Sequence, residues 1–92
     1  MAVAVLMNFS GGTNDAYDRV IEKMGLSDGT PPDGASFHVA GEVDGGFRVV
    51  DVWESAERFQ QFAQDQIAPI TQEEGFPQPE VSIWEVHNTM PR

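Results

Sequence analysis

The chain has 92 residues, no cysteine and a formal net charge of −10, because 15 acidic residues outnumber five Lys and Arg. This length suits one domain, residues 1–92, and the lack of cysteine excludes disulfides and thiolate metal sites. The negative charge repels nucleic acid and anionic membrane surfaces, so neither is an expected partner.

The first predicted element is a strand at 3–9, a short segment rich in branched and aromatic side chains. This apolar stretch is too short to span a bilayer and carries no basic leader, so we expect a cytoplasmic protein. A helix follows, capped by Thr13 or Asn14 and ended by Gly25. Its apolar stripe has helical spacing and consists of Tyr17, Val20, Ile21 and Met24.

A loop and a hairpin come next. Three glycines and two prolines between 25 and 35 leave no room for regular structure. Two apolar runs follow, at 36–43 and 46–53, joined by Asp44 and Gly45. An Asp-Gly pair between two apolar runs predicts a two-residue hairpin turn, because both residues tolerate positive φ.

The last two elements are a helix and a strand. Ser55 is expected to cap the helix, and Pro69 to kink or end it late in its course. The helix carries an apolar stripe made of Phe59, Phe62, Ala63, Ile67 and Ile70. A connector at 73–79 leads to a final strand at 80–87.

The order of these elements is strand, helix, strand, strand, helix, strand. Short, right-handed connections favour one antiparallel four-stranded sheet with both helices on one face. We therefore predict the α+β class, with a ferredoxin-like βαββαβ domain.

The strands are apolar on both faces, although two helices can cover only one. The third strand has Val49 and Trp53 on one side, and Val50 and Val52 on the other. A large exposed apolar patch is rare on a monomer, and a second copy packed sheet against sheet would cover it. We therefore predict a homodimer through the sheet face. The alternative is a monomer whose second face is covered by the 25–35 loop and the C-terminal tail.

The element order, the two-faced strands and the segment VVDVWESAERFQQF at 49–62 resemble the dimeric α+β barrel proteins. Within them, the chain is most similar to the antibiotic-biosynthesis-monooxygenase-like group. The resemblance implies a dimeric α+β barrel. Its members include cofactor-independent monooxygenases of aromatic polyketides, haem-degrading enzymes, isomerases, decarboxylases and proteins without known activity, so the fold alone does not give the function.

Asp51 is a charged residue inside an apolar strand. If Asp44 and Gly45 form a two-residue turn, His38 lies opposite Asp51, with Cβ atoms about 4.5–5.5 Å apart. A loop one residue longer would turn His38 to the other face. A buried carboxylate needs a partner or a proton, and an imidazole would supply the partner.

Two interpretations of this pair remain open. In the catalytic one, Asp51 fixes the tautomer of His38, which acts as a base on a phenol-like substrate, while Trp53 forms an aromatic wall. We predict these three as the catalytic residues. In the structural one, the pair holds the strand register, or Asp51 binds Arg48 or Arg58 of a second subunit.

Five further residues are predicted to bind the ligand: Asn8, Tyr17, Arg48, Phe62 and Trp84. The resemblance favours Trp53 as a pocket residue and matches Asn8 to a pocket asparagine of some haem-degrading members. The hydroxyl of Tyr17 would reach a pocket beneath the helices. Arg48 would hold an anionic substrate group or a partner carboxylate.

We expect no cofactor and no metal. Haem-degrading members carry a haem-ligating histidine on the second helix, and the matching segment at 65–72 has none. The expected ligand is an aromatic or polyketide-like molecule in an apolar pocket. An enzyme of this kind would catalyse cofactor-independent oxygenation or isomerisation, and the alternative is a non-catalytic ligand-binding or structural dimer. The pocket would lie on the Trp53 side or on the Val50 and Val52 side of the sheet.

Overall fold

A computed structural model describes residues 1–91 and shows the predicted βαββαβ order. Its elements are β1 (Val3–Ser10), α1 (Asn14–Met24), β2 (Ala35–Val43), β3 (Gly46–Trp53), α2 (Ala56–Phe62), the π-helical turn η1 (Ala63–Ile67), α3 (Ala68–Glu73) and β4 (Glu80–Glu85). The segments α2, η1 and α3 follow one another directly and act as one long second helix. The predicted ferredoxin-like α+β class is therefore confirmed.

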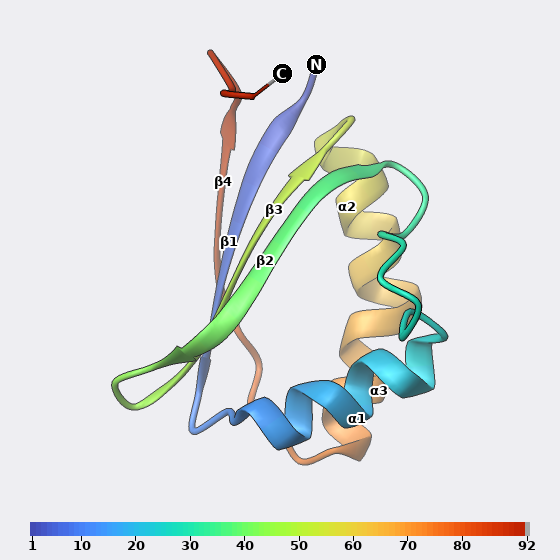
Figure 1. The fold of residues 1–92 in the computed structure, drawn as a ribbon, viewed down its shortest axis with the longest axis vertical. Helices are drawn as coiled ribbons and strands as arrows, with labels where there is room; N and C mark the ends of the chain where they lie inside the picture. The colour runs from blue at the N-terminus through green and yellow to red at the C-terminus, as the bar shows by residue number, and fades with distance from the viewer. Residues whose placement is uncertain (92) are drawn as a thin grey trace.

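The four strands form one antiparallel sheet in the order β2-β3-β1-β4. Both helical segments lie on the same side of this sheet, and the 25–34 loop lies with them (Figure 1). The other face of the sheet carries no helix. One face is thus covered and one is bare, as the element order predicted.

The β2–β3 hairpin has the predicted two-residue turn. Val43 pairs with Gly46, and Gly45 has φ +78°, a left-handed conformation that glycine adopts without steric cost. The register that follows places His38 directly opposite Asp51. The predicted pairing of these two residues is confirmed.

The helix boundaries follow the predicted caps. The side chain of Thr13 accepts a hydrogen bond from the N–H of Ala16 at 3.1 Å, so Thr13 rather than Asn14 is the first cap. Gly25 ends α1 with φ +76°. Ser55 caps α2 by accepting from the N–H of Arg58 at 3.1 Å.

Pro69 lies late in the second helix, which ends four residues further on at Glu73, in agreement with the predicted end near this proline. The hydrogen bonding is adjusted one turn before Pro69, in the π-helical turn. Proline has no N–H to donate to the carbonyl four residues back. The wider turn shifts the bonding, so that the N–H of Ala68 bonds to the carbonyl of Ala63. The π turn therefore accommodates the missing N–H of Pro69, for which we expected a kink.

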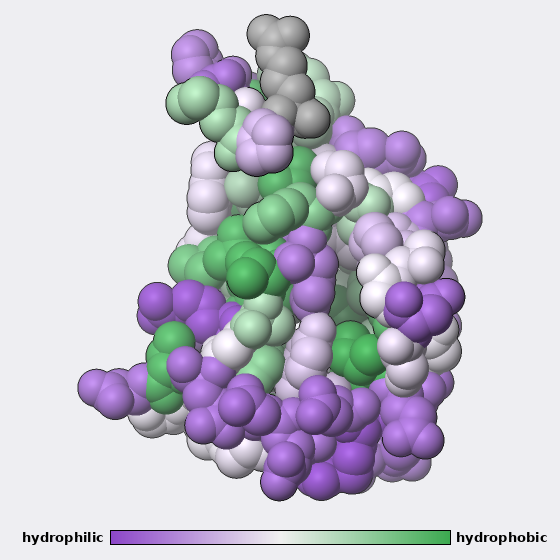
Figure 2. Space-filling view, in the orientation of Figure 1, coloured by the Kyte–Doolittle hydropathy of each residue, from purple (hydrophilic) through white to green (hydrophobic). Residues whose placement is uncertain are grey.

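The core lies between the sheet and the helices, and the bare face is also apolar. The core consists of buried side chains from every layer: Val3, Val5, Met7, Phe9, Phe47, Val49, Trp53, Phe59 and Ile67. On the bare face Phe37 and Val39 are about half exposed, at 54% and 51%. Figure 2 shows such apolar side chains along β2, on the side away from the helices.

The 25–35 loop does not cover this apolar face, because it lies on the helix side (Figure 1).

Within residues 1–91, no helix has both the length and the apolar character that a membrane crossing requires. The last strand is two residues shorter than predicted and ends at Glu85, although the N–H of Val86 still bonds to the carbonyl of Ala2 at 3.0 Å.

Candidate functional site

A cavity of about 360 Å³ lies between the covered face of the sheet and the helices. Its floor is formed by the three strands β1, β2 and β3, and its roof by α1 and the second helix. The apolar side chains of its lining include Met7, Phe9, Val20, Ile21, Met24, Phe47, Val49, Phe62, Ile67 and Phe76. The cavity therefore lies on the side of the sheet that holds Trp53.

The loop that follows α1 forms one wall of this cavity. It contributes both apolar and hydroxyl-bearing residues: Leu26, Ser27, Gly29, Thr30, Pro31 and Pro32. The side chain of Asp28 accepts from the N–H of Thr30 at 2.9 Å, which fixes the turn at the middle of the loop.

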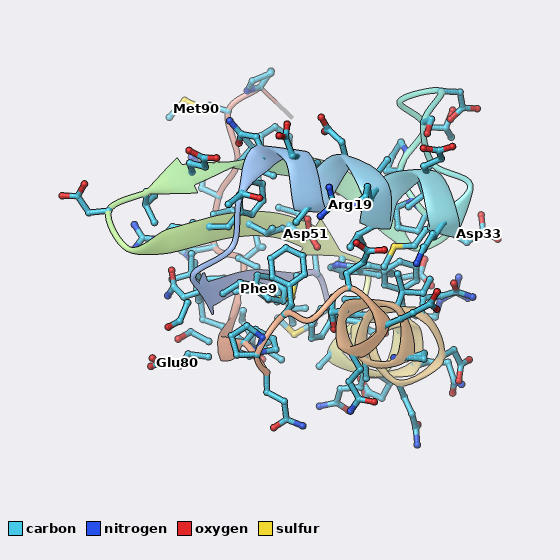
Figure 3. All side chains as sticks on the ribbon, turned by 90° about the horizontal axis from the view of Figure 1, so that it is seen from below. Phe9, Arg19, Asp33, Asp51, Glu80 and Met90 are labelled. Carbon is cyan, nitrogen blue, oxygen red and sulfur yellow. The ribbon has the colours of Figure 1, made fainter. Side chains whose placement is uncertain are left out.

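A chain of hydrogen bonds links four side chains at the sheet end of the cavity. The hydroxyl of Tyr17 lies 2.5 Å from Nε2 of His38, and Nδ1 of His38 lies 2.5 Å from Oδ1 of Asp51. Nε1–H of Trp53 donates to Oδ2 of Asp51 at 3.2 Å. Figure 3 shows Asp51 pointing from the sheet toward α1. The chain runs from α1 across β2 to β3 and joins three elements at one point.

One arrangement of protons satisfies every member of this chain. A neutral His38 donates from Nδ1 to the Asp51 carboxylate and accepts the Tyr17 O–H at Nε2. Asp51 is only 4% exposed, and its two oxygens accept from His38 and Trp53. Among the described residues, no buried side-chain nitrogen or oxygen lacks a partner. The charge inside the strand is thus stabilised by two donors.

Tyr17 is held in place by aromatic contacts as well as by its hydroxyl. Its ring stacks on Phe47 at 4.8 Å between centroids and lies nearly parallel to the imidazole of His38 at 5.9 Å. Burial raises the pKa of Tyr17 above its ordinary value of 10.0, and the charges of Asp51 and Asp18 add to the effect. Tyr17 is therefore a neutral phenol at neutral pH.

Four of the predicted site residues line the cavity: His38, Asp51, Tyr17 and Phe62. Trp53 does not line it, because its side chain is only 1% exposed and packs behind Asp51 against the rings of Phe59 and Phe62. Trp53 thus supports Asp51 from behind instead of forming the expected wall. Its position two residues from Asp51 on the same strand puts both side chains on one face, a relation that the sequence contained.

Asn8, Arg48 and Trp84 lie on the other face of the sheet. Nε–H of Arg48 donates to Oδ1 of Asn8 at 2.7 Å, in a cross-strand pair. Successive residues of a strand point to opposite faces, and these residues neighbour side chains of the covered face. We predicted that all three bind the ligand, but none of them lines this cavity.

Ion pairs tie the two helices together outside the cavity. The Arg19 side chain lies 2.8 Å from Glu74, and Lys23 lies 2.6 Å from both Glu73 and Glu74. In Figure 3, Arg19 points from α1 toward the second helix. Hydrogen bonds from Arg19 and then from Lys23 hold the pKa of Glu74 below its ordinary value. These contacts had no recognisable signal in the sequence, because they join residues about fifty positions apart.

The lining of the cavity contains no Lys or Arg. Besides Tyr17, the ionisable side chains of the lining are His38 and Asp51, and each is bound to the other. Within residues 1–91, no three His, Asp or Glu side chains are grouped to hold a metal ion. The arrangement suits a neutral ligand and supplies one base, a histidine oriented by a carboxylate.

Comparison with known proteins identifies the fold. No protein-family model and no curated protein matches the chain. Among solved structures, SnoaB from Streptomyces nogalater, a cofactor-independent oxygenase, is similar at 18% identity and a TM-score of 0.66, over 99% of this chain and 98% of that one. Rv0793 from Mycobacterium tuberculosis is similar at 14% identity and 0.68, over 98% and 99%.

A putative antibiotic biosynthesis monooxygenase from Deinococcus radiodurans is similar at 10% identity and a TM-score of 0.63, over all of this chain and 98% of that one. At these low identities the likeness concerns the fold. The chain shares the ferredoxin-like βαββαβ fold of these structures, and this part of what the sequence resemblance predicted is confirmed.

Proposed function

We propose that the cavity binds an aromatic or polyketide-like small molecule and that the His38–Asp51 pair acts on it as a base. The observation that carries this proposal is the hydrogen-bonded chain from Tyr17 to Trp53, which meets an apolar cavity. A volume of about 360 Å³ falls within the usual range of ligand pockets. An apolar lining with a few convergent polar groups is also typical of such pockets.

The ligand is a neutral, electron-rich phenol in this proposal. The cavity lining offers aromatic surfaces and no cation to bind a carboxylate or phosphate. Removal of the phenolic proton leaves an anion close to the imidazolium that forms on His38. Asp51 stabilises that imidazolium through the Nδ1–H bond.

The reaction we propose is cofactor-independent oxygenation or isomerisation. In the oxygenation, dissolved O₂ is the oxidant: a ring methylene of the substrate anion becomes a carbonyl, and the second oxygen atom leaves as water. In the isomerisation, the proton taken from the phenolic oxygen is returned to a ring carbon, which gives the ketone tautomer, and nothing is oxidised. SnoaB, a cofactor-independent oxygenase with the same fold, supports the first of these two reactions.

The protein that carries this site is a homodimer in our proposal, joined through the bare sheet face. Phe37, Val39 and Trp84 are each about half exposed on that face, at 54%, 51% and 50%. Exposed apolar surface of this kind is typical of interaction sites. A second copy would cover the same residues on both partners, in a two-fold arrangement.

A second candidate function is a non-catalytic ligand-binding or structural dimer. One specific observation favours it: the chain of hydrogen bonds is closed, because His38 and Asp51 already have all of their nitrogens and oxygens bonded. A closed set of bonds holds β2, β3 and α1 in register without any reaction.

Oxygen consumption separates the two candidates. We expect purified protein to consume O₂ with at least one member of a panel of electron-rich polycyclic phenols. A His38→Ala variant should lose this activity by about 10²-fold or more and stay folded by circular dichroism. His87→Ala is the matched control, because the chain has two histidines and His87 is exposed outside the cavity. Folded protein that consumes no O₂ with any phenol of the panel, and converts none of them to an isomer, would favour the non-catalytic dimer.

A further inference from the structure

We propose that Tyr17 is the residue that contacts the substrate and that it relays the substrate's proton to His38. This inference rests on the proposed function and names the atom at which the proton enters the site. The hydroxyl of Tyr17 would accept the substrate proton while its own proton passes to Nε2 of His38. Tyr17 is thereby assigned as a catalytic residue, and His38 is the group that finally accepts the proton.

The first argument is that His38 has no free nitrogen. Its Nδ1 is bound to Asp51 at 2.5 Å and its Nε2 to the hydroxyl of Tyr17 at 2.5 Å. A proton donor approaching from the cavity would have to displace one of these partners. Both partners are fixed, since Asp51 is buried with a second bond to Trp53 and Tyr17 is stacked on Phe47.

The Tyr17 hydroxyl can also accept a further hydrogen bond. A hydroxyl donates one hydrogen bond and accepts up to two. The structure shows one bond at this oxygen, to Nε2 of His38. Tyr17 also belongs to the lining of the cavity. Its oxygen can therefore accept a hydrogen bond from a ligand hydroxyl without breaking any of the hydrogen bonds that link Tyr17 to His38, Asp51 and Trp53.

The proton balance of the relay is complete within these groups. The substrate O–H breaks as a new O–H forms on Tyr17, and the former Tyr17 O–H breaks as an N–H forms on His38. The products are a substrate oxyanion, a neutral Tyr17 and an imidazolium beside the Asp51 carboxylate. No charge remains on Tyr17, which agrees with a phenol whose pKa is raised by burial and by Asp51. The reverse sequence returns the proton.

The experiment uses 4-nitrophenol, whose acid and anion differ in colour. The full-length protein is titrated with it at a pH about one unit below its midpoint of ionisation in water. We expect the wild type to bind it as the anion, with the visible absorbance of nitrophenolate. Tyr17→Phe keeps the stacked ring and should bind with a similar Kd, but it should lose most of that anion absorbance. Gln60→Ala, on the exposed side of α2, is the control.

A spectroscopic readout identifies the acceptor. Tyr17 is the single tyrosine of the protein, so a ¹³C-tyrosine label reports on this residue alone. His38 is one of two histidines, so a ¹⁵N-histidine label reports on His38 and His87. With ligand bound, we expect His38 to show the imidazolium ¹⁵N shifts while Tyr17 keeps the ¹³C shift of a neutral phenol. The signal of His87 should not move.

The outcomes separate the relay from the proposed function. If Tyr17→Phe still binds the anion and still protonates His38, the relay is overturned, while His38 remains the base. If the wild type binds 4-nitrophenol only as the neutral phenol, the base and the relay both fall and a ligand-binding protein remains. If the wild type does not bind it, the relay is overturned, and if it also binds no phenol of the electron-rich panel, the proposed ligand class falls as well.

Discussion

The two faces of the sheet are built from the same strands but differ in how their side chains are bonded and covered. On the covered face, the polar side chains of His38 and Asp51 are bonded to each other and to residues of α1 and β3. On the bare face, the polar pair of Arg48 and Asn8 is exposed, and the apolar side chains around it have no cover from a helix. The hydrogen-bonded site thus lies on the face beneath the helices, and the open apolar surface lies on the other face.

The two tryptophans make this comparison measurable, because one lies on each face. Trp53 is 1% exposed and Trp84 is 50% exposed. We expect Trp53→Ala to lower the free energy of unfolding by about 3–5 kcal/mol, the cost of emptying a packed aromatic site. Trp84→Ala should cost less than about 1 kcal/mol in the monomer. Urea denaturation at low protein concentration measures both.

For Trp84→Ala, the loss should grow as the protein concentration rises, because a dimer is stabilised by mass action and this variant weakens it. Equal losses for the two variants at low concentration would remove the distinction between the faces.

A charge on the bare face should break the association without harming the fold. Val39→Glu places an unpaired carboxylate in the proposed interface and should weaken the dimer by at least about tenfold. Light scattering at micromolar concentration would then report the mass of one chain. Gln60→Glu adds the same charge on the exposed side of α2 and is the control. A wild type with the mass of one chain would refute the proposed dimer itself.

These contrasts show which features of the site could be predicted from the sequence. The Asp44-Gly45 turn determines the hairpin register, and the register determines that His38 meets Asp51. Alternation along β3 predicted two apolar faces, but it could not tell which one the helices cover. The meeting of Tyr17 with His38 depends on where α1 crosses β2, a tertiary relation that no local pattern contains.

Asn8 shows a different limit. It was chosen because it matched a pocket residue of some haem-degrading relatives of the fold, and the structure places it on the bare face, paired with Arg48. Its two neighbours, Met7 and Phe9, are the residues of β1 that line the cavity. In a strand, a shift of one position reverses the face, so a resemblance between distant sequences identifies the strand more securely than the residue.

The single tyrosine offers a smaller and sharper test of the covered face. Its raised pKa means that the ultraviolet titration of tyrosinate should have a midpoint above 10.0 in the folded protein. The folded state then holds this proton where the unfolded state has lost it, so the free energy of unfolding falls as the pH rises through that range. Tyr17→Phe should remove this part of the pH dependence. A midpoint at or below 10.0 would contradict the buried position of Tyr17.

The smallest expected effect concerns the ion pairs between the helices. The lowered pKa of Glu74 adds stability that is present above its ordinary value of 4.5 and is lost as the pH falls through the lowered folded value. Glu74→Gln should therefore flatten the acid side of the stability profile, more at low than at high salt. Glu57→Gln, on the exposed side of α2, is the control and should leave the profile unchanged.

The central claim is that the covered face holds a working base and not only a closed structural pair. The most direct test is the state of 4-nitrophenol bound to His38→Asn, compared with His87→Asn. We expect the coloured anion in the wild type and in His87→Asn, and the neutral phenol in His38→Asn. An anion bound equally by all three proteins, or a neutral phenol bound by all three, would contradict it.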